Sequence, residues 1–330
     1  MATSISVVLP NYNGRSLIES FLPYTLQALH QIHLDFEVIL VDDASQDDSV
    51  QWVSRHFPDV KIISNSTNRG FSFSCNAGVR EAVSDLVLLL NTDIKLSEDY
   101  LLHLITYFDR EDTFGVMGKI LNPHTSKLEI GAKIPRRRGV LMKSGQNYLP
   151  AKTDSNELLP TFFLSGANAL IDRKKLEILG GFDEVFSPFY SEDLDLSVRA
   201  WRMGWKCYFE PKAQCFHVGS ASIKTSAAKS KIKRIYFRNR MIFHAIHLEE
   251  NQLKWWKAQT LLTEVLPKLF MGKPWIWNSY REMLDLWPKI LQSRIRINSL
   301  IQTSRSPKSL TQIHDEILSL APKSIQVQPH

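Results

Sequence analysis

The chain has 330 residues, of which 44% are apolar and 22% are charged, as in an ordinary globular protein with a sizeable core. Its three cysteines are widely spaced and odd in number, which argues against a disulfide framework and a CxxC metal site. The N-terminus lacks the pattern of a secretory signal, and no apolar run reaches the ~18 residues of a membrane span. We therefore expect a cytoplasmic protein, or one attached at the inner face of the cell membrane without crossing it.

The net charge of +6 is unevenly distributed along the chain. Residues 219–330 contain 18 Lys and Arg against 7 Asp and Glu, which leaves residues 1–218 with a net charge of −5. Five of the eight tryptophans also lie in the basic part: Trp255, Trp256, Trp275, Trp277 and Trp287. The two parts are thus expected to have different electrostatic tasks.

The first half of the chain alternates strand-like and helix-like segments. Runs typical of strands cover residues 5–10, 36–43, 60–64 and 86–93. Helical spacing of apolar residues covers residues 16–31, 49–57, 71–83 and 97–108. This alternation predicts an α/β fold with a Rossmann-like, mostly parallel sheet flanked by helices. Ligands of such sheets bind beyond the carboxyl ends of the strands.

The second half is predicted in less detail. Residues 122–160 are interpreted as irregular structure or a β-excursion, residues 162–173 as a strand, and residues 191–204 as a helix with Ser191 as its N-cap and Gly204 as its stop. The basic remainder is predicted to be helical, and roughly its last ten residues to be a frayed tail.

Polar residues follow each predicted strand of the first half, and they are expected to converge on one edge of the sheet. They are Pro10, Asn11 and Tyr12, then Asp42 and Asp43, then Asn68 and Arg69, and finally Asn91 and Asp93.

The stretch "VDDASQDDS" places four aspartates within residues 41–49, a pattern compatible with a helix cap, a metal site or a ligand contact. Asp47 and Asp48 precede a predicted helix, where acidic residues complement the helix dipole.

Asn91 and Asp93 lie on a tight turn behind a buried strand, in the segment "LLLNTD". An aspartate there can bind Mg²⁺ or Mn²⁺ together with a diphosphate. Taken alone, such a turn is more often only a turn. His217 follows another strand-like segment; a lone histidine there is usually structural, and it could share a metal only if Asp93 lay close in space.

Glu192 and Asp193 fall in the first turn of a predicted helix. Acidic residues there commonly complement the helix dipole, and the alternative is a general base for an attacking hydroxyl. At another helix start, "NRGFSFSCNAG" places Gly70, Asn76 and Gly78 where backbone N–H groups could face an anion. The sequence has no GxGxxG or Walker A pattern, so a dinucleotide dehydrogenase or P-loop enzyme is not expected.

These segments occur in a specific order. "VVLPNYNG", "VDDASQDDS", "NRGFSFSCNAG", "LLLNTD", "LSGANALIDR", "GGFDEVFSPFYSEDLDLSVRAWRMGW" and "FHVGS" together resemble the family 2 glycosyltransferases, inverting enzymes of the GT-A fold, including bacterial glycan and rhamnosyltransferases. The resemblance covers about residues 4–245. It implies a catalytic domain over residues 1–245 and a basic, Trp-rich helical extension over residues 246–330.

The resemblance implies roles for residues in each of these motifs. The implied nucleotide-binding residues are Pro10, Tyr12, Asp43, Asn68, Asn76, Asn91 and Asp93. Pro10 and Tyr12 would line the base and Asp43 would accept its N–H. Asp93, at the last position of the family's DXD motif, would bind Mg²⁺ or Mn²⁺ with help from His217. Because Asn91 replaces an aspartate of that motif, it is expected to touch sugar or ribose.

Asp193 would be the catalytic base, with Glu192 beside it; the sequence does not decide between them. The implied reaction transfers a hexosyl or deoxyhexosyl group from a UDP- or dTDP-sugar to a hydroxyl of a glycan or lipid-linked acceptor, in polysaccharide or cell-envelope biosynthesis. The alternative is a catalytically silent nucleotide-sugar-binding or scaffold protein.

The extension resembles a helix lying at a membrane interface, and the alternative is a buried cap or oligomer contact. No nucleic-acid-binding motif is present. Donor sugar, acceptor and oligomeric state stay open.

Overall fold

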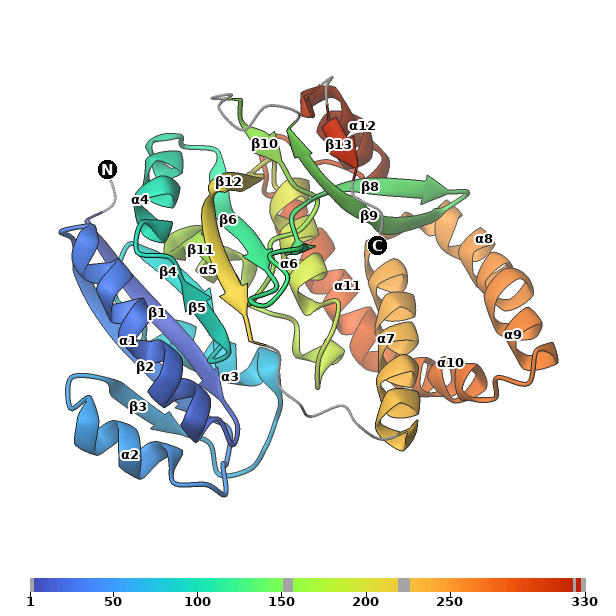
Figure 1. The fold of residues 1–330 in the computed structure, drawn as a ribbon. Coiled ribbons are helices and arrows are strands. Elements are labelled where there is room, and N and C mark those ends of the chain that lie inside the picture. Colours follow the sequence, from blue (N-terminus) through green and yellow to red (C-terminus); the bar gives the residue numbers. More distant parts are fainter. Residues whose placement is uncertain (1–2, 151–156, 219–225, 323–324, 328–330) are drawn as a thin grey trace.

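The computed structural model describes residues 3–150, 157–218, 226–322 and 325–327. Helices flank a mixed sheet, and the C-terminal helices lie on the side remote from strands β1–β3 (Figure 1). The strands are β1 Ser4–Asn11, β2 Asp35–Asp42, β3 Lys61–Ser64, β4 Leu86–Leu90, β5 Ile94–Leu96, β6 Thr113–Leu121, β7 Leu128–Ile130, β8 Ala132–Arg138, β9 Leu141–Pro150, β10 Leu159–Pro160, β11 Asn168–Asp172, β12 Lys206–His217 and β13 Ile325–Val327. The helices of the first 217 residues are α1 Arg15–Gln31, α2 Ser49–His56, α3 Phe71–Glu81, α4 Tyr100–Ile105, η1 Thr106–Asp109, α5 Arg173–Leu179, η2 Glu184–Phe186 and α6 Glu192–Arg202. The later helices are α7 Ser226–His247, α8 Glu250–Thr260, the π-helical turn η3 Leu261–Val265, α9 Leu266–Phe270, α10 Trp275–Asp285, α11 Trp287–Gln302 and α12 Leu310–Leu320.

The main sheet confirms the predicted α/β class. Within the described residues its order is β10-β12-β6-β11-β4-β1-β2-β3, with β5 paired to β12 and β7 to β6. Strands β4, β1, β2 and β3 run parallel, as does the pair β6–β12. Strand β11 is antiparallel to both of its neighbours, β4 and β6. The sheet is therefore mixed, and the predicted parallel part consists of the strands from the first half of the chain, β1 to β4.

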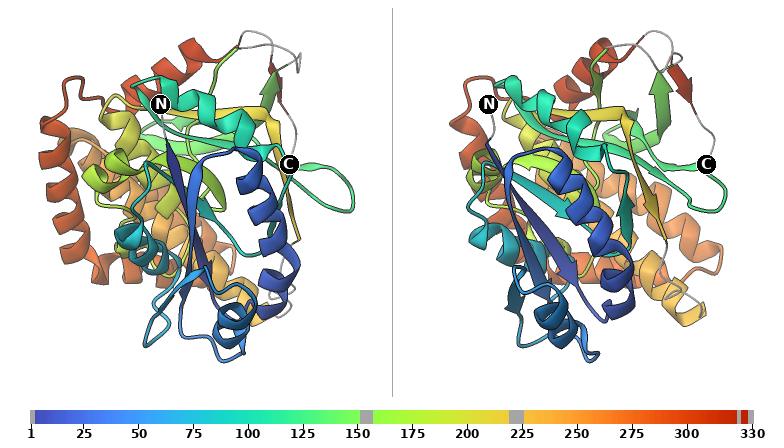
Figure 2. Two further views of the ribbon diagram at one scale, coloured as in Figure 1. Left: turned by 90° about the vertical axis from the view of Figure 1, so that its left-hand side faces the viewer. Right: turned by 60° about the vertical axis from the view of Figure 1, so that its left-hand side comes forward.

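Two hydrophobic cores cover the two faces of the sheet, so strands β1 and β2 are buried on both sides. One core joins alternate strand residues to α1 and α4. The other joins the remaining strand residues to α3, α6 and the C-terminal helices. Seen from the β1–β3 side, some of the C-terminal helices lie behind the sheet and others to one side of it (Figure 2).

Gly78 allows α3 to pack closely on the sheet. A Cβ at this position would lie 2.4 Å from a methyl group of Val8 and 3.0 Å from a methyl group of Val41. Gly78 lies inside α3 and not at its start, so its predicted place at a helix start is wrong, and it serves helix–sheet packing.

The predicted β-excursion is confirmed, since β8 and β9 form an antiparallel pair. Strand β13 adds to β9 and forms a second, three-stranded sheet. The predicted frayed tail is thus wrong for residues 325–327, while residues 323–324 and 328–330 lie outside the described part. The predicted strand over residues 162–173 is shorter, Asn168–Asp172.

The C-terminal part is helical, as predicted. Buried residues of α7, α8, η3, α10, α11 and α12 belong to the same hydrophobic core as Val8 and Phe114 of the sheet. The extension is therefore packed on the catalytic part, and the domain boundary at residue 245 stays a prediction. No helix in the described ranges is long and apolar enough to cross a membrane.

Candidate active site

The carboxyl ends of β1 and β2 are joined by side chains. Asn11 lies opposite Asp42 in the parallel register and donates from Nδ2 to its carboxylate at 2.8 Å. The adjacent loop approaches the end of β4 so closely that a Cβ at Gly14 would lie 2.3 Å from Asn11 Oδ1 and 3.4 Å from Thr92 Oγ1. The predicted convergence of β1, β2 and β4 at one edge is thus present.

The four aspartates of residues 41–49 have different surroundings. Asp43 is buried and accepts hydrogen bonds from the backbone N–H groups of Arg69 at 3.1 Å and Gly70 at 2.8 Å, and from Asn65 Nδ2 at 2.9 Å. Asp42 accepts the N–H of Ser45 and so shapes the turn. Asp43 therefore fixes the loop before α3 against the end of β2.

Asp47 joins two helix entries. It accepts the backbone N–H of Arg15, the first residue of α1, at 3.0 Å and that of Ser49, the first residue of α2, at 3.1 Å. Burial opposes its ionisation, but the hydrogen bonds from Ser49 and Arg15 outweigh this and lower the pKa of Asp47. Asp48 is the N-cap residue of α2 without a side-chain cap bond. This pair therefore lies at helix starts, as predicted.

The turn after β4 carries two buried oxygens that have no hydrogen-bond partner among the described residues. They are Asn91 Oδ1 and Asp93 Oδ1. Unpaired buried acceptors are costly, and oxygen atoms of this kind are the ligands preferred by Mg²⁺ and Mn²⁺. The donor set at this turn therefore fits a hard divalent cation.

His217 lies beside Asp93, as a shared metal site requires. Its Nε2 is 3.1 Å from Asp93 Oδ2, and its Nδ1 is 3.0 Å from Glu129 Oε2 on β7. The hydrogen bond to Asp93 outweighs burial, and with Glu129 it raises the pKa of His217 to about 9. A metal ligand must be a neutral imidazole, so binding of a cation to His217 would require loss of a ring proton.

Across the described part of the chain, no group of three or more His, Cys, Asp or Glu side chains is arranged to enclose a metal ion. The oxygens at residues 91–93 would therefore form an open site, completed by a ligand or water, as Mg²⁺ sites commonly are.

Glu192 and Asp193 begin α6 and differ in burial. Glu192 is buried and its Oε2 has no hydrogen-bond partner in the described part of the chain, whereas Asp193 is partly exposed. Burial, and then the nearby Asp193 carboxylate, raise the pKa of Glu192. Burial also raises the pKa of Asp193, against the hydrogen bond from its neighbour Leu194. The two groups thus favour one proton between them near neutral pH, on the more buried Glu192.

Asp193 lines a cavity of about 340 Å³ between α7 and the β8–β9 pair. The polar groups around it include Lys143, Tyr190, Tyr236 and Arg240. The cavity also has apolar walls from Met142, Phe163 and Phe243. A carboxylate in a cavity of this size can take a proton from a bound hydroxyl.

A buried charged network supports α6 from behind. Arg199 and Asp195 form an ion pair at 2.8 Å, and Asp195 also bonds His247 Nε2 at 2.8 Å. Arg199 donates further to the carbonyls of Leu179 at 2.7 Å and Gly181 at 2.8 Å. Burial opposes ionisation of Asp195, but Arg199 and His247 outweigh it and lower its pKa. The helix that carries Glu192 and Asp193 is thereby fixed to the neighbouring chain.

The sequence comparisons decide the family. The sequence model of the family described as Glycosyl transferase family 2 matches residues 6–180, which is more than half of the chain. The chain belongs to this family. It is a glycosyltransferase, and its α/β architecture agrees with that of solved members of the GT-A fold.

A curated relative and two solved structures show how far the similarity extends. The glycosyltransferase is 23% identical, over 78% of its own length and 88% of the relative's, to N-acetylglucosaminyl-diphospho-decaprenol L-rhamnosyltransferase of Mycobacterium tuberculosis. Residues 1–349 of TarS from S. aureus superpose with a TM-score of 0.55 at 15% identity, over 98% of this chain and 96% of that one.

The second structure is the mannosyltransferase PcManGT of Pyrobaculum calidifontis in complex with GDP-Man and Mn²⁺. It superposes with a TM-score of 0.52 at 15% identity, over 97% of this chain and 86% of that one. At this level of identity the two structures show a shared fold.

The predicted nucleotide-binding residues of the glycosyltransferase do not all lie at the edge where β1, β2 and β4 end. Pro10 and Tyr12 lie at the end of β1, with the Tyr12 side chain exposed. Asn68 is exposed on the loop that Asp43 fixes. The structure does not bring Asn76 to this edge: its amide donates to the Phe182 carbonyl at 2.9 Å and accepts the Phe182 N–H at 2.8 Å. We therefore leave Asn76 out of the proposed donor-binding set.

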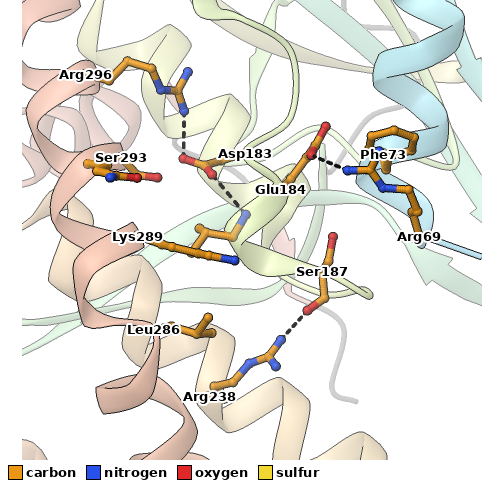
Figure 3. Close-up of a pocket in the computed structure, with 12 residues that line it drawn as sticks. Arg69, Phe73, Asp183, Glu184, Ser187, Arg238, Leu286, Lys289, Ser293 and Arg296 are labelled. Carbon is orange, nitrogen blue, oxygen red and sulfur yellow. Dashed lines mark hydrogen bonds and ion pairs between the residues drawn. The ribbon is translucent and has the colours of Figure 1, made fainter.

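A second cavity, of about 730 Å³, lies among η2, α7, α11 and the loop before α3 (Figure 3). Figure 3 shows Arg296 paired with Asp183, Arg69 facing Glu184, and Arg238 donating to the carbonyl of Ser187. Arg69, one of the polar residues predicted at the edge of the sheet, lines this cavity, whereas the predicted nucleotide-binding, catalytic and metal-binding residues do not. It is therefore distinct from the cavity at Asp193.

Two groups of residues at the candidate site were not found by sequence reasoning. Glu129 sits in the β-excursion, far along the chain from His217, and no spacing rule connects them. Tyr190, Tyr236 and Arg240 reach the Asp193 cavity only because α7 folds back onto the segment before α6.

Proposed function

We propose that this glycosyltransferase moves a hexosyl or deoxyhexosyl group from a nucleoside-diphosphate sugar to a hydroxyl of a glycan or lipid-linked acceptor, with inversion at the anomeric carbon. The observation that carries the proposal is the placement of Asp193: it faces a cavity from the start of α6, while its neighbour Glu192 is buried. The name of the curated relative describes a rhamnosyltransferase that acts on N-acetylglucosaminyl-diphospho-decaprenol. This supports an acceptor carried on a lipid diphosphate, in cell-envelope biosynthesis.

In the proposed reaction the acceptor binds in the Asp193 cavity. Asp193 accepts the proton of the acceptor hydroxyl as the oxygen attacks the anomeric carbon. The bond from that carbon to the diphosphate oxygen breaks, and the nucleoside diphosphate leaves with the bonding electron pair. Protonated Glu192 adds no second negative charge beside Asp193, and the network of Asp195 and Arg199 holds the helix in place.

The donor is proposed to lie at the ends of β1, β2 and β4. Pro10 and Tyr12 would line the base, and Asp43 would accept its N–H while it holds the loop that carries Asn68. Asn91 would contact the sugar or ribose through its Nδ2, which leaves its Oδ1 for a divalent cation. A carboxylate has about four acceptor positions, so the three N–H groups that Asp43 accepts leave one for the base.

We further propose that Asp93 and Asn91 hold Mg²⁺ or Mn²⁺ next to the diphosphate, with His217 able to join after losing a proton. The unpaired oxygens of both residues support this assignment. A cation bound there would neutralise charge that develops on the leaving diphosphate. PcManGT, whose structure contains GDP-Man and Mn²⁺, supports the same combination of ligands.

Transfer from UDP- and dTDP-sugars to a short-chain prenyl-diphosphate-linked sugar tests the catalytic assignment. We expect Asp193→Asn to lower kcat about 10²–10⁴-fold, the usual contribution of a general base. Asp59→Asn, an exposed aspartate before β3, is the matched control and should keep full activity. Undiminished turnover of Asp193→Asn would refute the assignment, and a comparable loss in Glu192→Gln with Asp193→Asn active would transfer the role to Glu192.

Two binding measurements test the rest of the proposal. Manganese titration with UDP should raise the thermal midpoint of the wild-type protein, and Asp93→Asn should remove the manganese-dependent part of that rise. A nucleotide sugar that stabilises the protein without any transfer or hydrolysis, across all donors and acceptors tried, would favour the catalytically silent alternative.

A further inference from the structure

The segment from α8 to the turn after α9 exposes large apolar side chains to solvent. Trp255 is 74% exposed, Leu262 63%, Phe270 88% and Met271 64%. We call these four residues the arm face. Several large apolar side chains exposed along one segment of a folded protein are a feature of surfaces that contact a partner or a membrane.

The segment that carries the arm face is already packed on the protein through other side chains, so the arm face is not the side that forms the core. Leu253, Trp256 and Val265 are buried and belong to the main hydrophobic core. Trp255 and Leu262 are seven residues apart, about two helical turns, so they project from a similar side of the helix, and Phe270 and Met271 lie at the end of α9 and in the turn after it. The arm is therefore fixed to the protein by one side and exposes a second apolar side.

The charges around the arm face are mostly positive. Between residues 250 and 278 there are four lysines, at positions 254, 257, 268 and 273, and two acidic residues, Glu250 and Glu264. Glu250 pairs with Arg294, and the buried Glu264 pairs with Arg240 and lies 3.9 Å from Lys268. The lysines therefore outnumber the carboxylates along the arm.

The tip of the β8–β9 pair adds further positive charge beside the arm (Figure 1). Arg136, Arg137 and Arg138 are exposed there. Gln259 of α8 connects the tip to the arm by donating to the carbonyl of Arg138 at 3.3 Å. The "PRRRG" segment is thus next to the arm face, although it is more than a hundred residues away in the sequence.

The arm is also connected to the cavity of Asp193. Glu264 of η3 forms an ion pair with Arg240 of α7 and lies 3.8 Å from Lys143 of β9. Arg240 and Lys143 both line the cavity that contains Asp193. A molecule bound at the arm face would therefore lie next to the elements that form the acceptor cavity.

We propose that the arm face docks on the surface of a lipid bilayer that contains anionic headgroups. Trp255, Leu262, Phe270 and Met271 would enter the boundary between headgroups and acyl chains, and the surrounding lysines and arginines would face the lipid phosphates. Apolar side chains within a basic rim are the features of interfacial helices. A second copy of the chain fits less well, because a symmetric contact would bring the two positive rims together.

This inference deepens the proposed function and rests on it in one respect: the acceptor is taken to be anchored in the same bilayer. Docking at the arm face would hold the cavity of Asp193 close to the membrane surface, where the diphosphate and first sugar of a lipid-linked acceptor are found.

Co-sedimentation with vesicles tests the docking surface. The full chain is mixed with vesicles of phosphatidylcholine alone or with one third phosphatidylglycerol, at low and at high salt. We expect binding to the anionic vesicles, weakened by salt. Phe270→Ser with Met271→Ser should lower the partition coefficient about tenfold or more, and Lys254→Gln with Lys273→Gln roughly fivefold per lysine. Val83→Ser is the matched control, an exposed apolar residue outside the arm, and should bind like the wild type.

The possible outcomes separate docking from catalysis. The docking proposal is overturned if the wild type does not bind anionic vesicles, or if the Phe270/Met271 variant binds them as well as the wild type. It is equally overturned if the variant abolishes a dimer seen by light scattering but leaves vesicle binding unchanged. With a water-soluble acceptor the variant should keep wild-type turnover, and with acceptor in vesicles it should lose it. Absence of turnover on both acceptors in the wild type, with vesicle binding intact, would refute the proposed function and leave the docking surface standing.

Discussion

Asn239 offers a sharp test of how the active site is held in place. This buried residue of α7 directs its Nδ2 at three backbone carbonyls of the segment before α6: those of Phe186, Phe189 at 2.9 Å and Tyr190 at 2.8 Å. The segment ends in Tyr190 and Ser191, which have φ angles of +75° and +73°, a conformation unfavourable for residues other than glycine. Asn239→Ala would remove the donor that holds this turn.

The expected loss of stability follows from these contacts. A side-chain amide nitrogen has two N–H groups, so the three carbonyls share two full-strength bonds. Each bond contributes about 0.5–1.5 kcal/mol, and each buried carbonyl left unpaired costs about 1–3 kcal/mol. We therefore expect Asn239→Ala to lower the free energy of unfolding by about 2–4 kcal/mol. Asn239→Asp should cost at least as much, because it turns a carboxylate toward three carbonyl oxygens.

Catalysis should fall as well, because the turn sets the position of Asp193. A displacement of about 1 Å at a reacting group can lower the rate by about 10²-fold. Urea unfolding, kcat and the Kd for the nucleotide by calorimetry are measured for both variants and for Asn278→Ala, an exposed asparagine of α10. We expect kcat to fall and the nucleotide Kd to stay the same. The reasoning is refuted if Asn239→Ala unfolds within about 0.5 kcal/mol of the wild type, the range of an ordinary surface substitution.

Two further predictions concern pH. Because burial raises the pKa of Asp193, this base is ionised only at a pH above the raised pKa. We therefore expect kcat/KM to rise with pH, with its midpoint above the pKa of about 4 of a free aspartate. A midpoint near pH 4 would contradict the burial argument. Burial also lowers the pKa of His244 to about 4, with its ring bonded to the Met142 N–H and the Arg240 carbonyl. A depressed folded pKa gives stability that is complete above the unfolded value of about 6.5 and is lost as the pH falls toward 4, on the order of 2 kcal/mol between pH 6.5 and pH 5. Urea unfolding should show this loss to be smaller in His244→Gln, and equal losses in the two proteins would contradict the assignment.

Local sequence was sufficient for the α/β class and for the edge at which β1, β2 and β4 end. The reason is that these features depend on apolar runs and on polar residues directly behind them, such as Asp43 after β2 and Asp93 after β4. The split of the "VDDASQDDS" aspartates also followed from position, since Asp47 precedes a helix while Asp42 ends a strand.

Only the tertiary structure showed what these residues contact. Asp193 and Glu192 are adjacent in the sequence, but one faces a cavity and the other is buried, because α7 and the β8–β9 pair close over the start of α6. His217 meets Glu129 through the pairing of β12, β6 and β7, which local patterns do not specify.

The same limit applies to the extension. Its composition predicted a basic, tryptophan-rich helical region, whereas the choice between a buried and an exposed tryptophan was made by packing. Trp256 lies in the core and Trp255 in solvent, although both stand in the same "KWWK" segment. A sequence determines which residues are apolar, but which of them lose contact with water depends on the elements that fold against them.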